Sequence, residues 1–160
     1  MPPATKNQQA LNDFLRRKKG EESSNIDWVA KRDEWMTSVK RLYRFLTEEL
    51  LKESIEEKTI LISKASKQIT EEYIGTYTLP ELTLRIGDAR VVFSPKGVNV
   101  VSAAGRVDVR GDKNTVMLIR EKASAASPDQ WKLVLQSVPN VVTRPLDSDG
   151  LKWALEQVML

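Results

Sequence analysis

Carboxylates are the side chains of this sequence best suited to acid–base or metal chemistry near neutral pH, because its 160 residues include no histidine and no cysteine. Histidine is the usual proton carrier near neutral pH, and the cysteine thiolate is a strong nucleophile. Ser-His-Asp triads, Cys-His dyads, zinc fingers and thiol redox centres therefore cannot be built from this chain. Glycoside hydrolysis and two-metal hydrolysis need only Asp and Glu, so carboxylate chemistry stays open.

Six carboxylates lie on or beside expected strands, namely Glu71, Glu72, Glu81, Asp88, Asp108 and Asp112. Asp108 is the most interesting of them, because Val107 and Val109 flank it in a clear strand pattern. Arg106 and Arg110 share the face of Asp108 and predict an exposed row of ion pairs there. No pair of these carboxylates stands out as catalytic.

Residues 147–150 spell Asp-x-Asp-Gly, as at the start of a calcium-binding loop. That loop needs an oxygen ligand at its fifth position and a bidentate glutamate at its twelfth, where this chain has Leu151 and Val158. Capping of a following helix explains the aspartates better. We therefore expect no catalytic residue, no metal site and no cofactor, which favours a non-enzymatic protein.

The composition fits one globular domain, with 41% apolar and 29% charged residues and a net charge of +3. The apolar runs are far too short to cross a bilayer, so no transmembrane segment is expected. The chain starts with Met1-Pro2-Pro3 followed by polar residues, without the apolar segment that a signal peptide needs. We expect a cytoplasmic protein.

Residues 1–24 read as a flexible lead-in with a short basic helix, from about Gln8 to Lys19. Leu11, Phe14 and Leu15 share one side of that helix, and Gly20 is expected to end it. Residues 16–19 are consecutive Arg and Lys, which suit the negative C-terminal end of a helix. A nucleic-acid contact or a targeting signal is the alternative interpretation of this basic run.

Residues 25–58 show helical spacing without a glycine or proline, which predicts one long amphipathic helix of about 30 residues and roughly 45 Å. The apolar positions share one side: Trp28, Val29, Trp35, Met36, Val39, Leu42, Tyr43, Leu46 and Leu50. Glu53 and Glu57 continue the same arc. The last two turns are therefore expected to project into solvent or to meet basic groups.

The charges of this helix are segregated along its length. Basic residues occupy the first two-thirds (Lys31, Arg32, Lys40, Arg41 and Arg44), and acidic residues occupy the end (Glu48, Glu49, Glu53, Glu56 and Glu57). This order opposes the helix dipole, which favours acids at the start. One hypothesis is antiparallel pairing of two copies in a homodimer. The other is that the apolar stripe covers the chain's own sheet.

After residue 58 the pattern changes to the period of two that is typical of strands. Expected strands cover residues 59–63, 72–79, 81–86, 89–94, 98–103, 106–110, 115–120 and 131–137, and residues 64–68 either prolong the first strand or form a loop. Short turns rich in Gly, Pro and Asp join them, which indicates antiparallel hairpins. An amphipathic helix follows residues 145–150, capped by Asp147 or Ser148.

The predicted fold is α+β, with the long helix, then an antiparallel β-meander of about six to eight strands, closed by a C-terminal helix. Residues 59–160 form the sheet and its helix, and residues 25–160 are expected to be one domain. In element order, the meander and the final helix with its Trp153 resemble a pleckstrin-homology-type barrel in outline. An open twisted sheet fits the same pattern, and architecture does not define function.

These features favour a protein-interaction module that binds another protein or itself through the long helix. The candidate interaction residues are Trp28, Arg32, Trp35, Arg41, Arg44, Glu48, Glu53, Glu57 and Trp153. Binding of anionic phospholipid or nucleic acid is the alternative, through residues 16–19 and the strand and turn cations Arg85, Arg90, Lys96, Arg106 and Arg110. A carboxylate-dependent hydrolase is the third and least favoured hypothesis.

Overall fold

The structure is a computed structural model of the chain, and it describes residues 6–24, 27–98, 104–121, 129–137 and 139–160. The helical elements before the sheet are α1 (Lys6–Ser24), α2 (Trp28–Phe45), the π-helical turn η1 (Leu46–Leu50) and α3 (Lys52–Glu56). The strands are β1 (Leu61–Glu71), β2 (Gly75–Ile86), β3 (Ala89–Gly97), β4 (Arg106–Arg110), β5 (Thr115–Glu121), β6 (Gln130–Ser137) and β7 (Asn140–Pro145). The final helix is α4 (Ser148–Met159).

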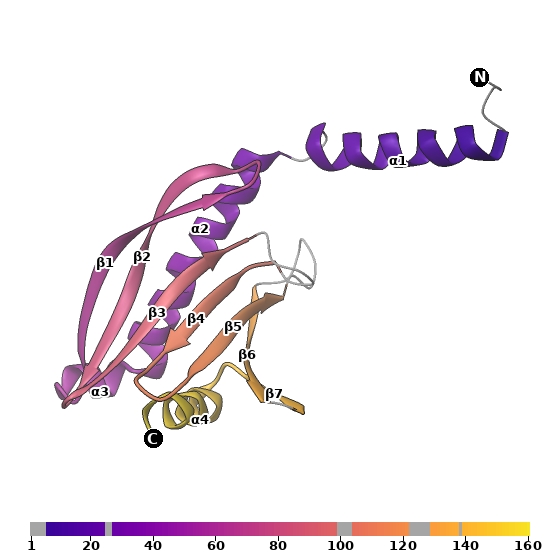
Figure 1. Cartoon of the computed structure of the whole chain (residues 1–160). Helices are drawn as coiled ribbons and strands as arrows, with labels where there is room; N and C mark the ends of the chain where they lie inside the picture. The colour runs from indigo at the N-terminus through magenta and orange to yellow at the C-terminus, as the bar shows by residue number, and fades with distance from the viewer. Residues whose placement is uncertain (1–5, 25–26, 99–103, 122–128, 138) are drawn as a thin grey trace.

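The seven strands form one sheet in chain order, and every neighbouring pair is antiparallel (Figure 1). This arrangement follows from the short connections, since parallel crossovers need about a dozen residues or more each. The strands β1 and β7 are the two edges, so the sheet is open and does not close into a barrel. The predicted α+β fold with an antiparallel meander and a C-terminal helix is confirmed, and the open sheet is the correct alternative.

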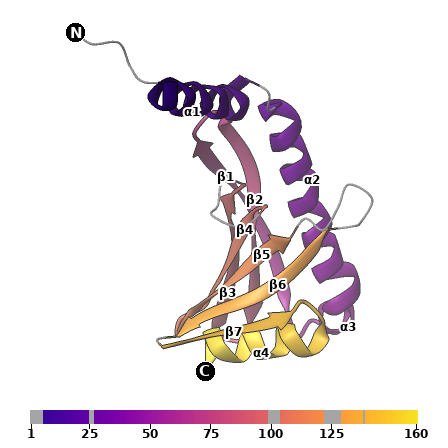
Figure 2. The same ribbon diagram turned by 90° about the vertical axis from the view of Figure 1, so that its right-hand side faces the viewer.

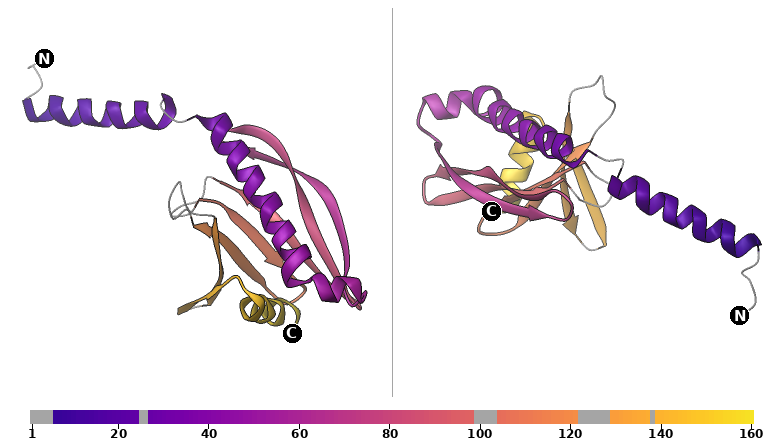
Figure 3. Two further views of the ribbon diagram at one scale, coloured as in Figure 1. Left: turned by 180° about the vertical axis from the view of Figure 1, so that it is seen from behind. Right: turned by 90° about the horizontal axis from the view of Figure 1, so that it is seen from above.

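Both α2 and α4 lie on the concave face of the curved sheet (Figures 2 and 3). The helix α2 runs along the sheet, and α4 lies against one end of the strands β3 to β6. One core joins the sheet to the helices on that side. It contains Trp35, Val39, Leu42 and Tyr43 from α2, Leu46 from η1, Val91, Phe93, Val107, Val109, Val116, Leu118 and Leu133 from the strands, and Leu151, Ala154 and Val158 from α4. The apolar stripe of α2 therefore covers the chain's own sheet.

The helix expected over residues 25–58 is interrupted, which corrects the prediction of one long helix. In η1 the N–H of Leu51 donates to the carbonyl of Leu46, 2.8 Å away and five residues back. A π turn inserts one extra residue and rotates everything that follows. Leu51 therefore faces the core at 6% exposure, while Glu53 and Glu57 are exposed, as their position beyond the apolar stripe predicted.

The strands differ from the sequence prediction in several places. Residues 64–68 prolong β1, which was one of the two alternatives. The pair Leu79-Pro80 is not a turn, because β2 runs through it, and β7 was not predicted. Most of the expected strand 98–103 lies outside the described residues.

Tyr43 contacts β2 at Pro80, in the part of the strand that β3 does not pair with, since β2 and β3 pair only over Leu82–Ile86. Its phenol donates hydrogen bonds to the carbonyl oxygens of Pro80 at 2.8 Å and Phe93 at 3.3 Å. Burial raises the pKa of Tyr43, and the charge of Glu81 raises it further, so the phenol stays a hydrogen-bond donor well above neutral pH. The side chain thereby fastens α2 to β2 and β3.

A second tyrosine holds the β1–β2 hairpin near its turn. The phenol of Tyr77 donates to the carboxylate of Glu71, which also accepts the N–H of Val98 at 2.9 Å. Burial raises the pKa of Tyr77, and the hydrogen bond to Glu71 adds to this rise. At the tip of the hairpin, Tyr73 stacks on Trp28 of α2, with ring centroids 5.2 Å apart.

Candidate interaction surfaces

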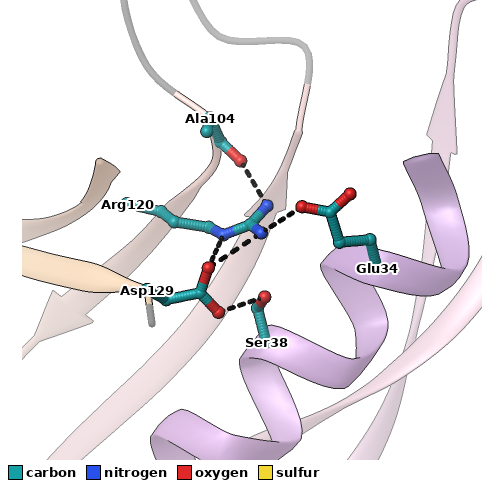
Figure 4. A network of polar contacts seen from close by, with 5 residues as sticks. All are labelled: Glu34, Ser38, Ala104, Arg120 and Asp129. Carbon is teal, nitrogen blue, oxygen red and sulfur yellow. Dashed lines mark hydrogen bonds and ion pairs between the residues drawn. The ribbon is translucent and has the colours of Figure 1, made fainter. Parts of the chain in front are cut away.

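A buried arginine joins α2 to the sheet (Figure 4). The side chain of Arg120 in β5 is 3% exposed, and its guanidinium donates to Asp129 at 3.0 Å, to Glu34 of α2 at 2.8 Å and to the carbonyl of Ala104 at 3.1 Å. The hydroxyl of Ser38 donates to the second oxygen of Asp129. Because the guanidinium and the Asp129 carboxylate are engaged with each other and their neighbours, this network positions elements and does not offer a free site.

A cleft of about 680 Å³ opens beside this network, between α2 and the β6–β7 hairpin. Apolar side chains line much of it: Leu42, Phe45, Trp131, Pro145 and Leu146. Its charged groups are Arg41, Glu121, Asp129, Lys132 and Arg144. Such a concave, mainly apolar surface with a few charged groups is typical of ligand sites.

The cleft carries an excess of positive charge. Glu121 forms an ion pair with Lys132, and Asp129 is bound to Arg120. Among the residues that the structure describes, no carboxylate pairs with Arg41 or Arg144. These two exposed guanidinium groups are available to an anionic group.

A second, apolar groove lies between η1 and α4, and we call it the η1–α4 groove. Its volume is about 330 Å³, and Leu50, Leu51, Leu151, Leu155 and Met159 line it. The segment that comprises η1, α3 and the residue after α3 carries five exposed glutamates, Glu48, Glu49, Glu53, Glu56 and Glu57. None of these glutamates has an ion-pair partner within the described part of the chain. The groove is thus apolar with an acidic border.

The helix α1 extends away from the body of the molecule (Figures 1 and 3). It continues to Ser24, so Gly20 does not end it as predicted. Leu11, Phe14 and Leu15 are 56%, 56% and 54% exposed and form one side of the helix. Within the described residues, no other element covers this apolar side of α1.

The residues predicted as interaction candidates do not form one site. Trp35 is fully buried, and Trp28 stacks on Tyr73. Arg32 forms an ion pair with its neighbour Asp33 at 3.0 Å. All three residues are thus engaged within the chain itself, Trp35 in the core and Trp28 and Arg32 at the N-terminal end of α2.

The other candidates lie elsewhere on the molecule. Arg41 reaches the cleft, and Arg44 is exposed on α2. Glu48, Glu53 and Glu57 are exposed at the opposite end of the helical segment from Trp28. Trp153 is half-buried, and the guanidinium of Arg144 lies 5.6 Å from the centre of its ring. The partner of Trp153 is therefore β7, the strand that the sequence pattern did not predict.

Sequence reasoning missed the Arg120 network. The alternation of β5 contained a signal for it, because Val116, Leu118 and Arg120 share one face of the strand and the first two are fully buried. A charged residue in phase with buried valine and leucine must be paired, since burial of an isolated charge is very costly. Its partners could not be identified from spacing, because Glu34 lies 86 residues away in the chain.

Asp108 is buried at 5% exposure, which corrects the prediction of an exposed ion-pair row. Arg106 lies over it and donates two hydrogen bonds, at 2.6 and 2.9 Å, so the predicted pairing itself is present. The second predicted arginine, Arg110, lies 3.7 Å from Glu81 instead. Among the described residues, no three Asp or Glu side chains are grouped so that they could hold a metal ion.

Comparison with known protein families, with curated proteins and with solved structures finds no match. No helix of the described residues is long and apolar enough to span a membrane. The chain thus defines an α+β body, with a basic cleft and an apolar groove, from which a helical arm extends.

Proposed function

We propose that the protein is a non-enzymatic protein-interaction module whose α1 arm binds a partner protein. The observation that carries this proposal is the apolar side of α1, where three neighbouring large side chains are each more than half exposed. An amphipathic helix gains most of its stability by laying its apolar side on another surface. Helix-in-groove binding uses the same spacing of apolar anchors.

The burial of α2 supports the choice of α1 as the binding element. Trp35 and Val39 of α2 and Leu46 of η1 are fully buried under the sheet, so their stripe cannot also bind a partner. Apart from the single exposed Val29, a partner of α2 would meet mainly charged side chains, and surface ion pairs contribute little to affinity. We further propose that the protein works in the cytoplasm, which fractionation of native cells tests.

We predict that replacing Leu11, Phe14 and Leu15 with glutamine abolishes co-purification of the partner from native cells. Glutamine keeps helix propensity while removing the apolar anchors. The matched control changes Gln9 and Asp13, on the opposite side of α1, to alanine, and it should retain the partner. Capture of the same proteins by the triple variant, or failure of cross-linking to detect any partner of the unaltered chain, contradicts the proposal.

A second candidate function is binding of an anionic ligand in the cleft. It is favoured by the two guanidinium groups of Arg41 and Arg144, which have no carboxylate partner among the described residues and border an aromatic surface. Arginine binds phosphate and carboxylate groups with two parallel hydrogen bonds. Phospholipid headgroups and nucleic acid share this chemistry.

Heparin, a polyanion, distinguishes this second candidate. We predict that the Arg41→Ala/Arg144→Ala variant elutes from heparin at lower salt than the unaltered chain, with the dependence of log affinity on log salt reduced by about two. The matched control is Arg85→Ala/Arg90→Ala, which removes two exposed cations from paired positions of β2 and β3. Equal losses in both variants indicate nonspecific attraction and contradict a site in the cleft.

A further inference from the structure

We infer that the α1 arm of one copy of this chain docks in the η1–α4 groove of a second copy. This inference rests on the proposed function and identifies the partner as the protein itself. The two surfaces match in chemistry, since one is a narrow apolar side of a helix and the other is an apolar groove of about 330 Å³ between helical elements. The groove thus supplies the cover that α1 lacks in its own chain.

The charges beside the two apolar surfaces are complementary, which supports the docking. Arg16, Arg17 and Lys18 follow directly after the apolar side chains of α1, and all three are exposed. Residues 46–58, beside the groove, contain five glutamates and two lysines, a net charge of −3. Within the described residues neither the three cations nor the five glutamates have an ion-pair partner. Two unpaired sets of opposite charge therefore border the two apolar surfaces.

The arm is too short to fill the groove of its own chain. Leu50 lies about 33 Å along the helical segment from Trp28, at 1.5 Å per residue. Leu15 lies about 14 Å from Ser24 along α1, and the chain from Ser24 to Trp28 spans at most about 14 Å when extended. Even with the linker fully stretched, only Leu11 would reach Leu50, and Phe14 and Leu15 would fall short of it. The three apolar anchors therefore cannot all enter the groove of their own chain, and we assign the occupant as a second copy.

This docking also accounts for the charge order of the N-terminal helical segment. Glutamates at its end oppose the helix dipole, and this local cost needs compensation from outside the segment. The basic residues of a docked arm provide that compensation. If each of two copies inserts its arm into the other, the contact closes on a two-fold axis and gives a dimer.

A charge exchange tests the inference, read out as molar mass by light scattering at about 0.1 M salt, where charges in contact still attract. We expect the unaltered chain to have at least twice the monomer mass of 18.1 kDa. Arg16→Glu/Arg17→Glu and Glu48→Lys/Glu49→Lys should each give the monomer mass. The chain that carries all four changes should regain the larger mass, because the opposite charges then face each other again.

Two exposed acidic residues at the Trp28 end of α2, Asp33 and Glu72, provide the matched control, because that end of α2 is opposite to η1. Asp33→Lys/Glu72→Lys should keep the larger mass. A monomeric unaltered chain overturns the inference, as does a four-fold variant that stays monomeric or an arm variant that still assembles. If the unaltered chain is monomeric but α1 still captures a different protein, the inference fails while the proposed function stands.

Discussion

Replacing Arg120 with methionine is expected to lower the free energy of unfolding by about 3 kcal/mol, as is typical when one partner of a buried ion pair is removed. The guanidinium is nearly inaccessible, and Asp129, at 17% exposure, would lose its cation in a site with little water. Ala104 would lose the donor to its carbonyl oxygen. The half-exposed Glu34 is hydrated more easily, so most of the cost arises at Asp129.

Urea unfolding followed by circular dichroism measures this loss. Arg110→Met is the matched control, because Arg110 is 48% exposed and lies 3.7 Å from Glu81, and we expect it to cost less than about 0.5 kcal/mol. The double variant Arg120→Met/Asp129→Asn should recover part of the loss, since no unpaired carboxylate then remains buried. Equal stability of the single and the double variant would show that Asp129 does not depend on Arg120.

The arrangement of the sheet could be predicted from the sequence because its determinants are local. Alternating apolar residues define each strand, and short turns such as residues 87–88 force consecutive strands into antiparallel hairpins. The capping aspartate of α4 was also readable, and Asp147 accepts the N–H of Gly150 at 2.7 Å. These features depend on residues within a few positions of one another.

The features that were missed depend on tertiary contacts. Nothing in the local spacing distinguishes a continuous helix from one with a π turn at Leu46, which is selected by the core that Leu51 enters. Pro80 fits within β2 because β3 pairs with β2 only over Leu82–Ile86, so the missing N–H of Pro80 breaks no ladder bond there, while Tyr43 satisfies its carbonyl oxygen. The strand β7 is almost wholly exposed, so it lacks the alternation that identifies a half-buried strand.

The candidate sites were even less predictable than the fold. The cleft combines residues of α2, β5, β6 and β7, and only Arg41 among its lining residues was predicted as an interaction candidate. The apolar groove needs Leu50 and Leu155 side by side, although more than a hundred positions separate them. By contrast, the apolar side of α1 and the acidic end of the N-terminal helices were readable, because helical periodicity alone defines them.

Gly105→Ala is expected to destabilise the protein by about 4 kcal/mol, through two separate effects. The backbone of Gly105 has a φ of +145°, a strained conformation for any L side chain. An added Cβ would also lie 2.6 Å from Cε3 and 2.8 Å from Cη2 of the Trp35 ring. That ring is fully buried and packs near Trp131, with centroids 6.0 Å apart, so it cannot turn away.

The two effects can be separated by removing the ring. In a Trp35→Leu background the added methyl group has space, so Gly105→Ala should cost about 2 kcal/mol less than in the unaltered chain, and the remaining cost reports the backbone strain. Gly87→Ala is the control, because Gly87 has a φ of +60° and no atom lies within 4 Å of its added Cβ. It should cost about 1 kcal/mol, as expected for a left-handed residue without a steric contact.

This comparison also tests how α2 is held against the sheet. The carbonyl of Gly105 accepts the N–H of Arg120 at 2.9 Å, so the glycine that contacts Trp35 is hydrogen-bonded to the arginine that binds Glu34. Displacement of the Trp35 ring should therefore weaken the Arg120 contacts as well. Gly105→Ala and Arg120→Met together should cost less than the sum of their separate losses, whereas strictly additive losses would show that the ring and the ion pair fasten α2 independently.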